Sequence, residues 1–157
     1  MSLFWILLFL HVLGAIVAFG PGFAAMVVGP MVAKEPQHAN FYARTQGAAN
    51  ERLVTPVALS MAVTGILMIV DRGWTNIVGG RHWLEVGIVL YVIAIAFAFA
   101  VQAPAGRKLV ELTSTPPAPG SPPNPQVPAT ARRVRNGGML LIGLVVVIVF
   151  LMVTKPF

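Results

Sequence analysis

His11 is the residue of this 157-residue chain whose type and position most directly suggest chemistry. The chain has four long apolar runs, at 3–28, 53–70, 84–101 and 139–153, and His11 is the only histidine inside one of them. Imidazole titrates near neutral pH and is the commonest metal ligand in proteins. Ionisable side chains within membrane-spanning segments are rare and usually mark functional sites. His11 is therefore the first candidate for a functional residue.

A hydroxyl and a phenol are expected at the same depth as this histidine if the apolar runs are membrane helices. His11 lies about eight residues from the outer end of its run, which is roughly 12 Å at 1.5 Å per residue. Thr64 lies about as far from Asp71, and Tyr91 about as far from Trp83. We predict that His11, Thr64 and Tyr91 meet in one polar layer in the outer half of a helical bundle.

Three roles are open for this layer. In the structural role, His11 forms a hydrogen bond with Thr64 or Tyr91, and the bond selects the helix arrangement. In the second role, His11 is an axial ligand of haem or a ligand of copper. In the third, it is one step in a proton path, because its imidazole titrates near neutrality.

The ligand roles need a second donor. Met61 and Met68 lie in the second run, and His82 lies at the outer rim. Met68 and His82 are both nearer the outer surface than His11, so each needs a helix tilt or a loop that dips inward. His82 and Glu85 together offer one imidazole and one carboxylate to a divalent ion. The candidate cofactor-binding residues are thus His11, Thr64, Tyr91 and Met68, and the candidate metal ligands are His11 and His82.

Composition identifies the elements that must position these residues. Hydrophobic residues make up 57% of the chain and charged residues only 10%, whereas soluble domains carry about 25% charged residues. Each run is close to the roughly 20 residues that cross a hydrocarbon core. We predict an all-α integral membrane four-helix bundle that forms a single domain over 1–157. The absence of cysteine excludes disulfides and thiolate metal sites.

The positive charges predict the orientation of the bundle. Net charge is +6, and the basic residues lie in loops beside apolar runs, so anionic lipid headgroups explain them better than nucleic acid does. Eight basic residues lie in the loops after the first and third runs, against three on the opposite side. Because basic loops remain in the cytoplasm, both termini are expected on the outer side.

The segments between the runs differ in character. Residues 34–52 are polar with Phe41 and Tyr42 interleaved, which predicts an interfacial segment. Residues 71–83 contain two tryptophans and glycine turns, as expected of a short outer hairpin. Residues 113–130 contain seven prolines and no charge, so we predict a disordered cytoplasmic loop there.

Small residues predict how the helices pack. On a helix, the face that carries His11 also carries Gly14, Ala15, Ala18, Gly22, Ala25 and Gly29. Such a stripe allows a second membrane helix to approach closely, so we expect His11 to face the bundle interior. The fourth run has no polar side chain before Thr154. It is therefore expected to be the peripheral helix, with the first three runs forming the core.

Two stretches resemble known families. Leu10-His11-Val12-Leu13-Gly14-Ala15 is similar to the opening of several small bacterial four-helix membrane families. Trp83-Leu84 and Leu90-Tyr91-Val92, followed by Gln102, resemble one of these in particular, which is described only as predicted integral membrane proteins of unknown function. That family is distantly similar to copper-resistance D-type membrane domains and to the haem-synthesis membrane protein that oxidises protoporphyrinogen. The resemblance covers roughly residues 3–112.

The resemblance implies a bacterial inner (plasma) membrane protein with a haem ligand in its first helix. His11 matches the histidine that is thought to bind haem in the haem-synthesis relatives. Their basic residue within a later span has no counterpart here, which argues against the oxidase activity. The leading hypothesis is a redox or haem-binding protein that uses His11 and haem b. The alternatives are a non-catalytic subunit or assembly factor of a homo-oligomer or larger membrane complex, and a proton- or solute-conducting component.

Overall fold

The structure, a computed structural model, describes residues 2–73, 82–115 and 124–156. These residues form α-helices and short helical turns, and no strand occurs among them. The α-helices are α1 (Leu3–Lys34), α2 (Ala39–Ala49), α3 (Thr55–Arg72), α4 (His82–Phe97), α5 (Ala103–Ser114) and α6 (Gln126–Thr154). The predicted all-α fold is confirmed.

The six α-helices combine into four units that are long and apolar enough to cross a membrane. The units are Leu3–Lys34, Pro36–Arg72, His82–Ser114 and Gln126–Thr154. Each contains one of the four apolar runs. A backbone in lipid must satisfy its own hydrogen bonds, so a chain with four such runs has to form four long helices.

Two π turns join short helices into the second and third units. Asn50–Val54 connects α2 to α3, and Ala98–Gln102 connects α4 to α5. Each π turn ends two residues before a proline, Pro56 or Pro104. Proline has no N–H to donate, and its ring crowds the preceding turn. The wider i→i+5 turn coincides with this disruption, and the helix continues through it. The segment 34–52, predicted as interfacial, therefore lies mostly in the same helical unit as α3.

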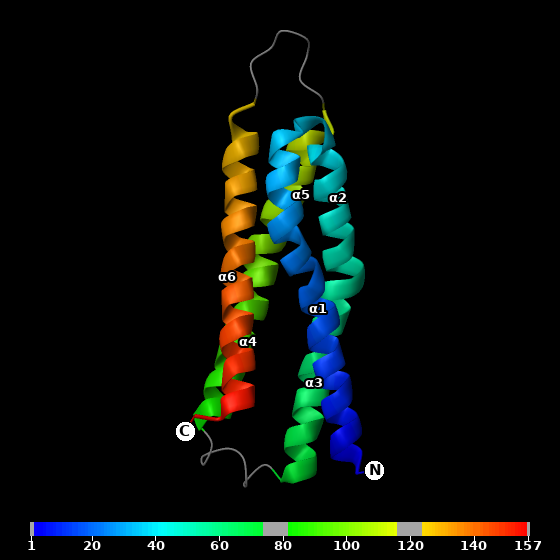
Figure 1. Ribbon diagram of the computed structural model, residues 1–157, viewed down its shortest axis with the longest axis vertical. Helices are drawn as coiled ribbons and strands as arrows, with labels where there is room; N and C mark the ends of the chain where they lie inside the picture. The colour runs from blue at the N-terminus through cyan, green and yellow to red at the C-terminus, as the bar shows by residue number, and fades with distance from the viewer. Residues whose placement is uncertain (1, 74–81, 116–123, 157) are drawn as a thin grey trace.

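The helices pack in pairs that change along the bundle (Figure 1). At the end that holds both termini, α1 packs against α3, and α4 packs against α6. At the opposite end, α2 packs against α5, and α5 packs against α6. In the described part of the chain, no Cα of α3 lies within 8 Å of a Cα of α4. The bundle is therefore two helix pairs at the terminal end and a closer assembly at the other.

The fourth run is not peripheral, contrary to prediction. Helix α6 packs against α4, α5 and α1, and Gly137, Val145 and Leu151 are buried on it. Glycine makes one of these contacts close, since a Cβ on Gly87 of α4 would lie 2.8 Å from Met152 Cε. Membrane helices pack by shape, so a helix without polar side chains can pack against several others.

Few side chains are enclosed by the single chain. Among the described residues, none with a large side chain is fully buried, and most apolar side chains on the helices remain exposed. In water such a surface would be unstable, but lipid is an apolar solvent for it. The exposed apolar surface fits a chain that is embedded in a bilayer.

Parts of two predicted loops lie outside the described residues. These are 74–81, within the predicted outer hairpin, and 116–123, within the proline-rich loop. Helix α5 ends at Ser114 and α6 begins at Gln126. Both ends of the predicted loop 113–130 are thus helical.

Candidate functional site

His11 bonds to Thr64 across the α1·α3 pair. Its Nδ1 atom lies 3.0 Å from Thr64 Oγ1, and both side chains are half-buried. Gly65 lies beside the ring, where an added Cβ would be 3.5 Å from His11 Cε1. The missing side chain at Gly65 gives the imidazole room against α3. The structure thus brings together two of the three residues predicted to share a polar layer.

The surroundings of Thr64 favour one arrangement of protons. Its Oγ1 atom lies 3.1 Å from the carbonyl oxygens of both Ser60 and Met61 in its own helix. A threonine hydroxyl has one proton to donate. When that proton goes to the main chain, Oγ1 accepts the Nδ1–H of His11. The neutral imidazole then keeps its lone pair on Nε2.

The Nε2 atom of His11 is not sealed inside the chain. Among the described residues, no buried side-chain nitrogen or oxygen lacks a hydrogen-bond partner. The side-chain hydrogen bond of His11 goes through Nδ1 to Thr64, so Nε2 is not completely buried. His11 therefore combines a ring held from one side with a second nitrogen that can be reached from outside.

Tyr91 does not join this layer. Its hydroxyl donates to the main-chain carbonyl of Ala58, six residues before Thr64 and about 9 Å farther along α3 at 1.5 Å per residue. Tyr91 is eight residues from Trp83, but Ala58 is thirteen from Asp71. The end of α4 thus lies about 8 Å deeper than the end of α3. The prediction assumed that these ends of α3 and α4 lie at the same depth. Because they do not, Tyr91 is separated from His11.

Met68 lies on the same helix pair as His11. The guanidinium carbon of Arg72 is 4.0 Å from the centroid of the Phe4 ring, and a Cβ on Gly14 would lie 2.9 Å from Met61 Cγ. Met68 lies on α3 between these two contacts. It is half-buried and lies one helical turn from Thr64, toward the end of the bundle that holds the chain termini. Met68 is therefore a neighbour of the His11 level and not a member of it.

His82 belongs to a separate feature. It lies exposed on α4, and its Nδ1 atom is 3.3 Å from Glu85 Oε2, three residues away. Within the described ranges, no group of three or more histidine, cysteine, aspartate or glutamate residues is placed to hold a metal ion. A hydrogen bond within one helix turn is a sufficient account of His82 and Glu85.

Two interhelical amides were not among the predicted site residues. Gln102 Nε2, in the π turn after α4, donates to the Val134 carbonyl of α6 at 2.8 Å. Asn40 Nδ2 lies 3.2 Å from the Val110 carbonyl and 3.2 Å from Thr113 Oγ1 of α5. An amide directly after an apolar run is the signal that would have found Gln102, because polar side chains connect helices in membranes. Asn40 lies in the polar segment between two runs and carries no such signal.

The comparison with protein families identifies the chain. Residues 5–156 match a family described as "Predicted integral membrane protein (DUF2269)". The chain belongs to this family. The predicted resemblance to an uncharacterised family of integral membrane proteins is thereby confirmed. No curated protein and no solved structure matches the chain.

DUF2269 membership supports a membrane protein and leaves its activity open. The distant similarity to copper-resistance and haem-synthesis proteins stays a prediction. What this member offers chemically is an oriented imidazole within an apolar helix. Its free nitrogen can ligate a metal centre, accept a proton or bond to a group from another molecule.

Proposed function

We propose that this DUF2269 protein is a haem-b-binding subunit of the bacterial plasma membrane and that His11 Nε2 is an axial ligand of the haem iron. The observation that carries the proposal is the 3.0 Å contact of His11 Nδ1 with Thr64, which leaves the opposite ring nitrogen accessible. Histidines that bind metal usually donate their other N–H to a fixed acceptor. Thr64 is suited to that role here.

Apolar side chains lie on either side of His11 and would contact a bound porphyrin. The helix pair α1·α3 offers exposed apolar side chains on either side of the histidine, including Leu10 and Val12. Met68 lies one turn from Thr64 on the same face of α3 and would help to hold the haem. Haem bound in this way would supply one-electron transfer, with its potential set by the axial ligands and their hydrogen bonds.

The test is a reduced-minus-oxidised visible spectrum of the detergent-purified protein from cells supplied with haem precursor. We expect a haem band in the parent protein and its loss in His11→Ala. His38→Ala is the matched control, since His38 is exposed near the opposite end of α1, and it should keep the band. A colourless parent protein, or an equal band in His11→Ala, would refute the proposal. Met68→Leu tests the contribution of Met68 to haem binding through a shift of the band.

A second candidate is a non-catalytic subunit of a larger membrane assembly. It is favoured by the His11–Thr64 bond itself, which is a complete structural role for a histidine between two helices. The exposed faces of the helix pairs would then meet other membrane chains. In this case the purified protein is colourless, and His11→Ala lowers its resistance to unfolding. The same spectrum therefore separates the two candidates.

A further inference from the structure

The terminal part of α3 is attached to the rest of the bundle through one partner helix. Among the described residues, α1 is the only other membrane-spanning unit with Cα atoms within 8 Å of those of α3. Figure 1 shows the α1·α3 pair and the α4·α6 pair diverging toward the end that holds both termini. Across this divide, the hydroxyl of Tyr91 on α4 donates to the carbonyl of Ala58 on α3. The Tyr91 bond is therefore a side-chain link between two pairs whose main chains stay apart.

Both helices of the α1·α3 pair are interrupted at the same depth. Pro21 of α1 and Val54, the last residue of the π turn before α3, each lie ten residues from the His11–Thr64 contact, which is about 15 Å at 1.5 Å per residue. The π turn also packs against α1. Pro21 has no N–H to donate to the preceding turn, and helices kink mainly at prolines, glycine pairs and π turns. The pair can therefore bend as a unit at this level.

The Tyr91 bond is sensitive to such a bend, whereas the contact of α1 with α6 is not. Ala58 follows Val54 by four residues, about 6 Å along the helix, so a bend of about 20° would move its carbonyl by about 2 Å. That displacement breaks a hydrogen bond, whose donor–acceptor distance varies by only about 0.5 Å. Gly22 lies directly after the proline in α1, and an added Cβ there would be 3.6 Å from Ile142 Cγ1 of α6. This contact is at the bend itself and is kept in both positions.

We propose that the terminal part of the α1·α3 pair swings as one body against the α4·α6 pair, with Pro21 and the π turn Asn50–Val54 as its hinge and the Tyr91–Ala58 bond as its latch. Hinges of this kind are a few positions at the ends of elements that absorb the change in main-chain angles, while the packed elements on either side move rigidly. The candidate site lies within the swinging part and is kept in either position. The proposal therefore does not depend on haem binding.

The experiment measures distances between spin labels on the full-length protein in nanodiscs. The chain has no cysteine, so double electron–electron resonance can be recorded on any introduced pair. Val70→Cys with Val86→Cys places labels at exposed positions near the terminal ends of α3 and α4. Val70 lies 16 residues from Val54, about 24 Å. The latch variant Tyr91→Phe should therefore add a population displaced by about 8 Å for a bend of about 20°. Parent distances in Tyr91→Phe overturn the proposal.

Two further label pairs locate the bend, again at exposed positions. Val63→Cys with Val86→Cys should shift about half as much, because Val63 lies nine residues from the hinge residue Val54 and Val70 lies 16. Ile16→Cys with Val70→Cys lies within the swinging part and should not shift. Equal shifts at Val63 and Val70 mean that α3 moves without bending, and a shift between Ile16 and Val70 means that α3 leaves α1. Either result overturns the proposal.

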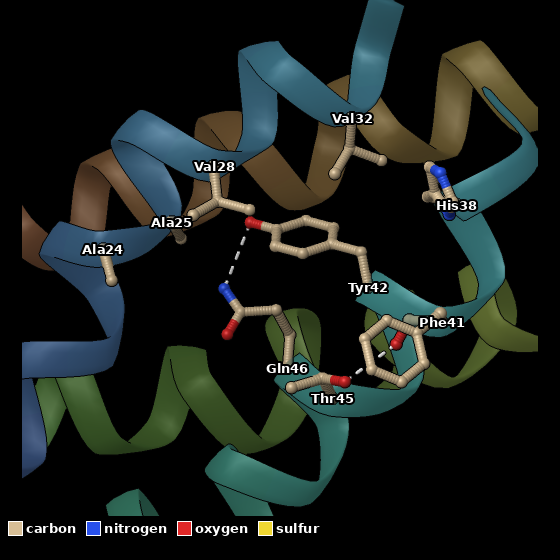
Figure 2. Close-up of a pocket in the computed structure, with 9 residues that line it drawn as sticks. All are labelled: Ala24, Ala25, Val28, Val32, His38, Phe41, Tyr42, Thr45 and Gln46. Carbon is tan, nitrogen blue, oxygen red and sulfur yellow. Dashed lines mark hydrogen bonds between the residues drawn. The ribbon is translucent and has the colours of Figure 1, made fainter. Parts of the chain in front are cut away.

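Tyr42→Phe is the matched control for the loss of a phenol hydroxyl. Tyr42 is the other tyrosine of the chain, and its hydroxyl accepts a bond from Gln46 Nε2 of the same helix at 3.2 Å, as Figure 2 shows. We expect parent distances in this variant, and a shift as large as in Tyr91→Phe would contradict the latch. Pro21→Ala, made in the Tyr91→Phe background, restores the N–H donor of α1 and should reduce the displaced population. An undiminished population there would contradict the hinge.

Discussion

Substituting Gly137 by alanine should displace one hydrogen-bonded side chain, that of Gln102. A Cβ at Gly137 would overlap Gln102 Oε1 and would lie 3.3 Å from Gln102 Cδ. The amide can swing away, but it then loses its 2.8 Å bond to the Val134 carbonyl. Interhelical hydrogen bonds in membranes contribute about 0.6 kcal/mol on average and up to about 1.7. Alanine itself favours a helix by about 0.5–1 kcal/mol over glycine.

The quantity to measure is therefore the coupling energy between Gly137→Ala and Gln102→Ala, and not the change in stability caused by Gly137→Ala alone. We expect Gly137→Ala to be neutral or destabilising in the parent protein and stabilising by about 0.5–1 kcal/mol in a Gln102→Ala background. The assay is reversible unfolding in mixed detergent micelles, with all four members of the cycle measured. Gly143→Ala is the control on the same helix, because nothing lies within 4 Å of its added Cβ. Additive effects of the two substitutions would refute the contact, since coupling is the signature of residues that touch.

Three further substitutions test other contacts by the same unfolding assay. Thr64→Val removes the acceptor of the imidazole and should cost about 0.6–1.7 kcal/mol; no loss would mean that the bond does not stabilise the helix pair. Gly73→Ala should cost about 1–2 kcal/mol, because Gly73 ends α3 with φ 83°, and an unchanged midpoint would contradict that conformation. Gly14→Ala should destabilise through Met61 Cγ at 2.9 Å, whereas Gly20→Ala, with open space around its Cβ, should be neutral or stabilising.

The four membrane helices were predictable because the bilayer leaves few alternatives. Long apolar runs must satisfy their main-chain bonds internally, and helices are the simplest way to do so. The pairing of His11 with Thr64 was predictable for a related reason. Phe4 and Arg72 lie together at the same end of α1 and α3, so residues at equal distances from those ends meet. Counting residues along the sequence predicts contacts reliably when the neighbouring ends of two antiparallel helices lie at the same depth.

The same counting was wrong for Tyr91 because helix offset is not encoded in hydrophobicity. The end of α4 lies deeper than the end of α3, and Tyr91 therefore reaches Ala58 instead of the His11 level. The contacts of α6 with α1, α4 and α5 were missed because polarity was used as the sign of burial. In lipid, glycine contacts such as Gly87 with Met152 decide which helix faces pack.

The π turns show a further reason why side-chain faces could not be read along whole helices. One residue advances an α-helix by about 100°, so the extra residue that a π turn accommodates rotates everything beyond it by about that angle. Asn40 lies before the turn Asn50–Val54 and contacts α5, whereas Thr64 lies after this turn and contacts α1. The change from α1·α3 packing at one end to α2·α5 packing at the other is a direct consequence. A single uninterrupted helix period cannot relate the two ends of these units. A proline follows each of the two π turns, but Pro21 and Pro30 lie within α1 without one, so proline alone does not mark where the period breaks.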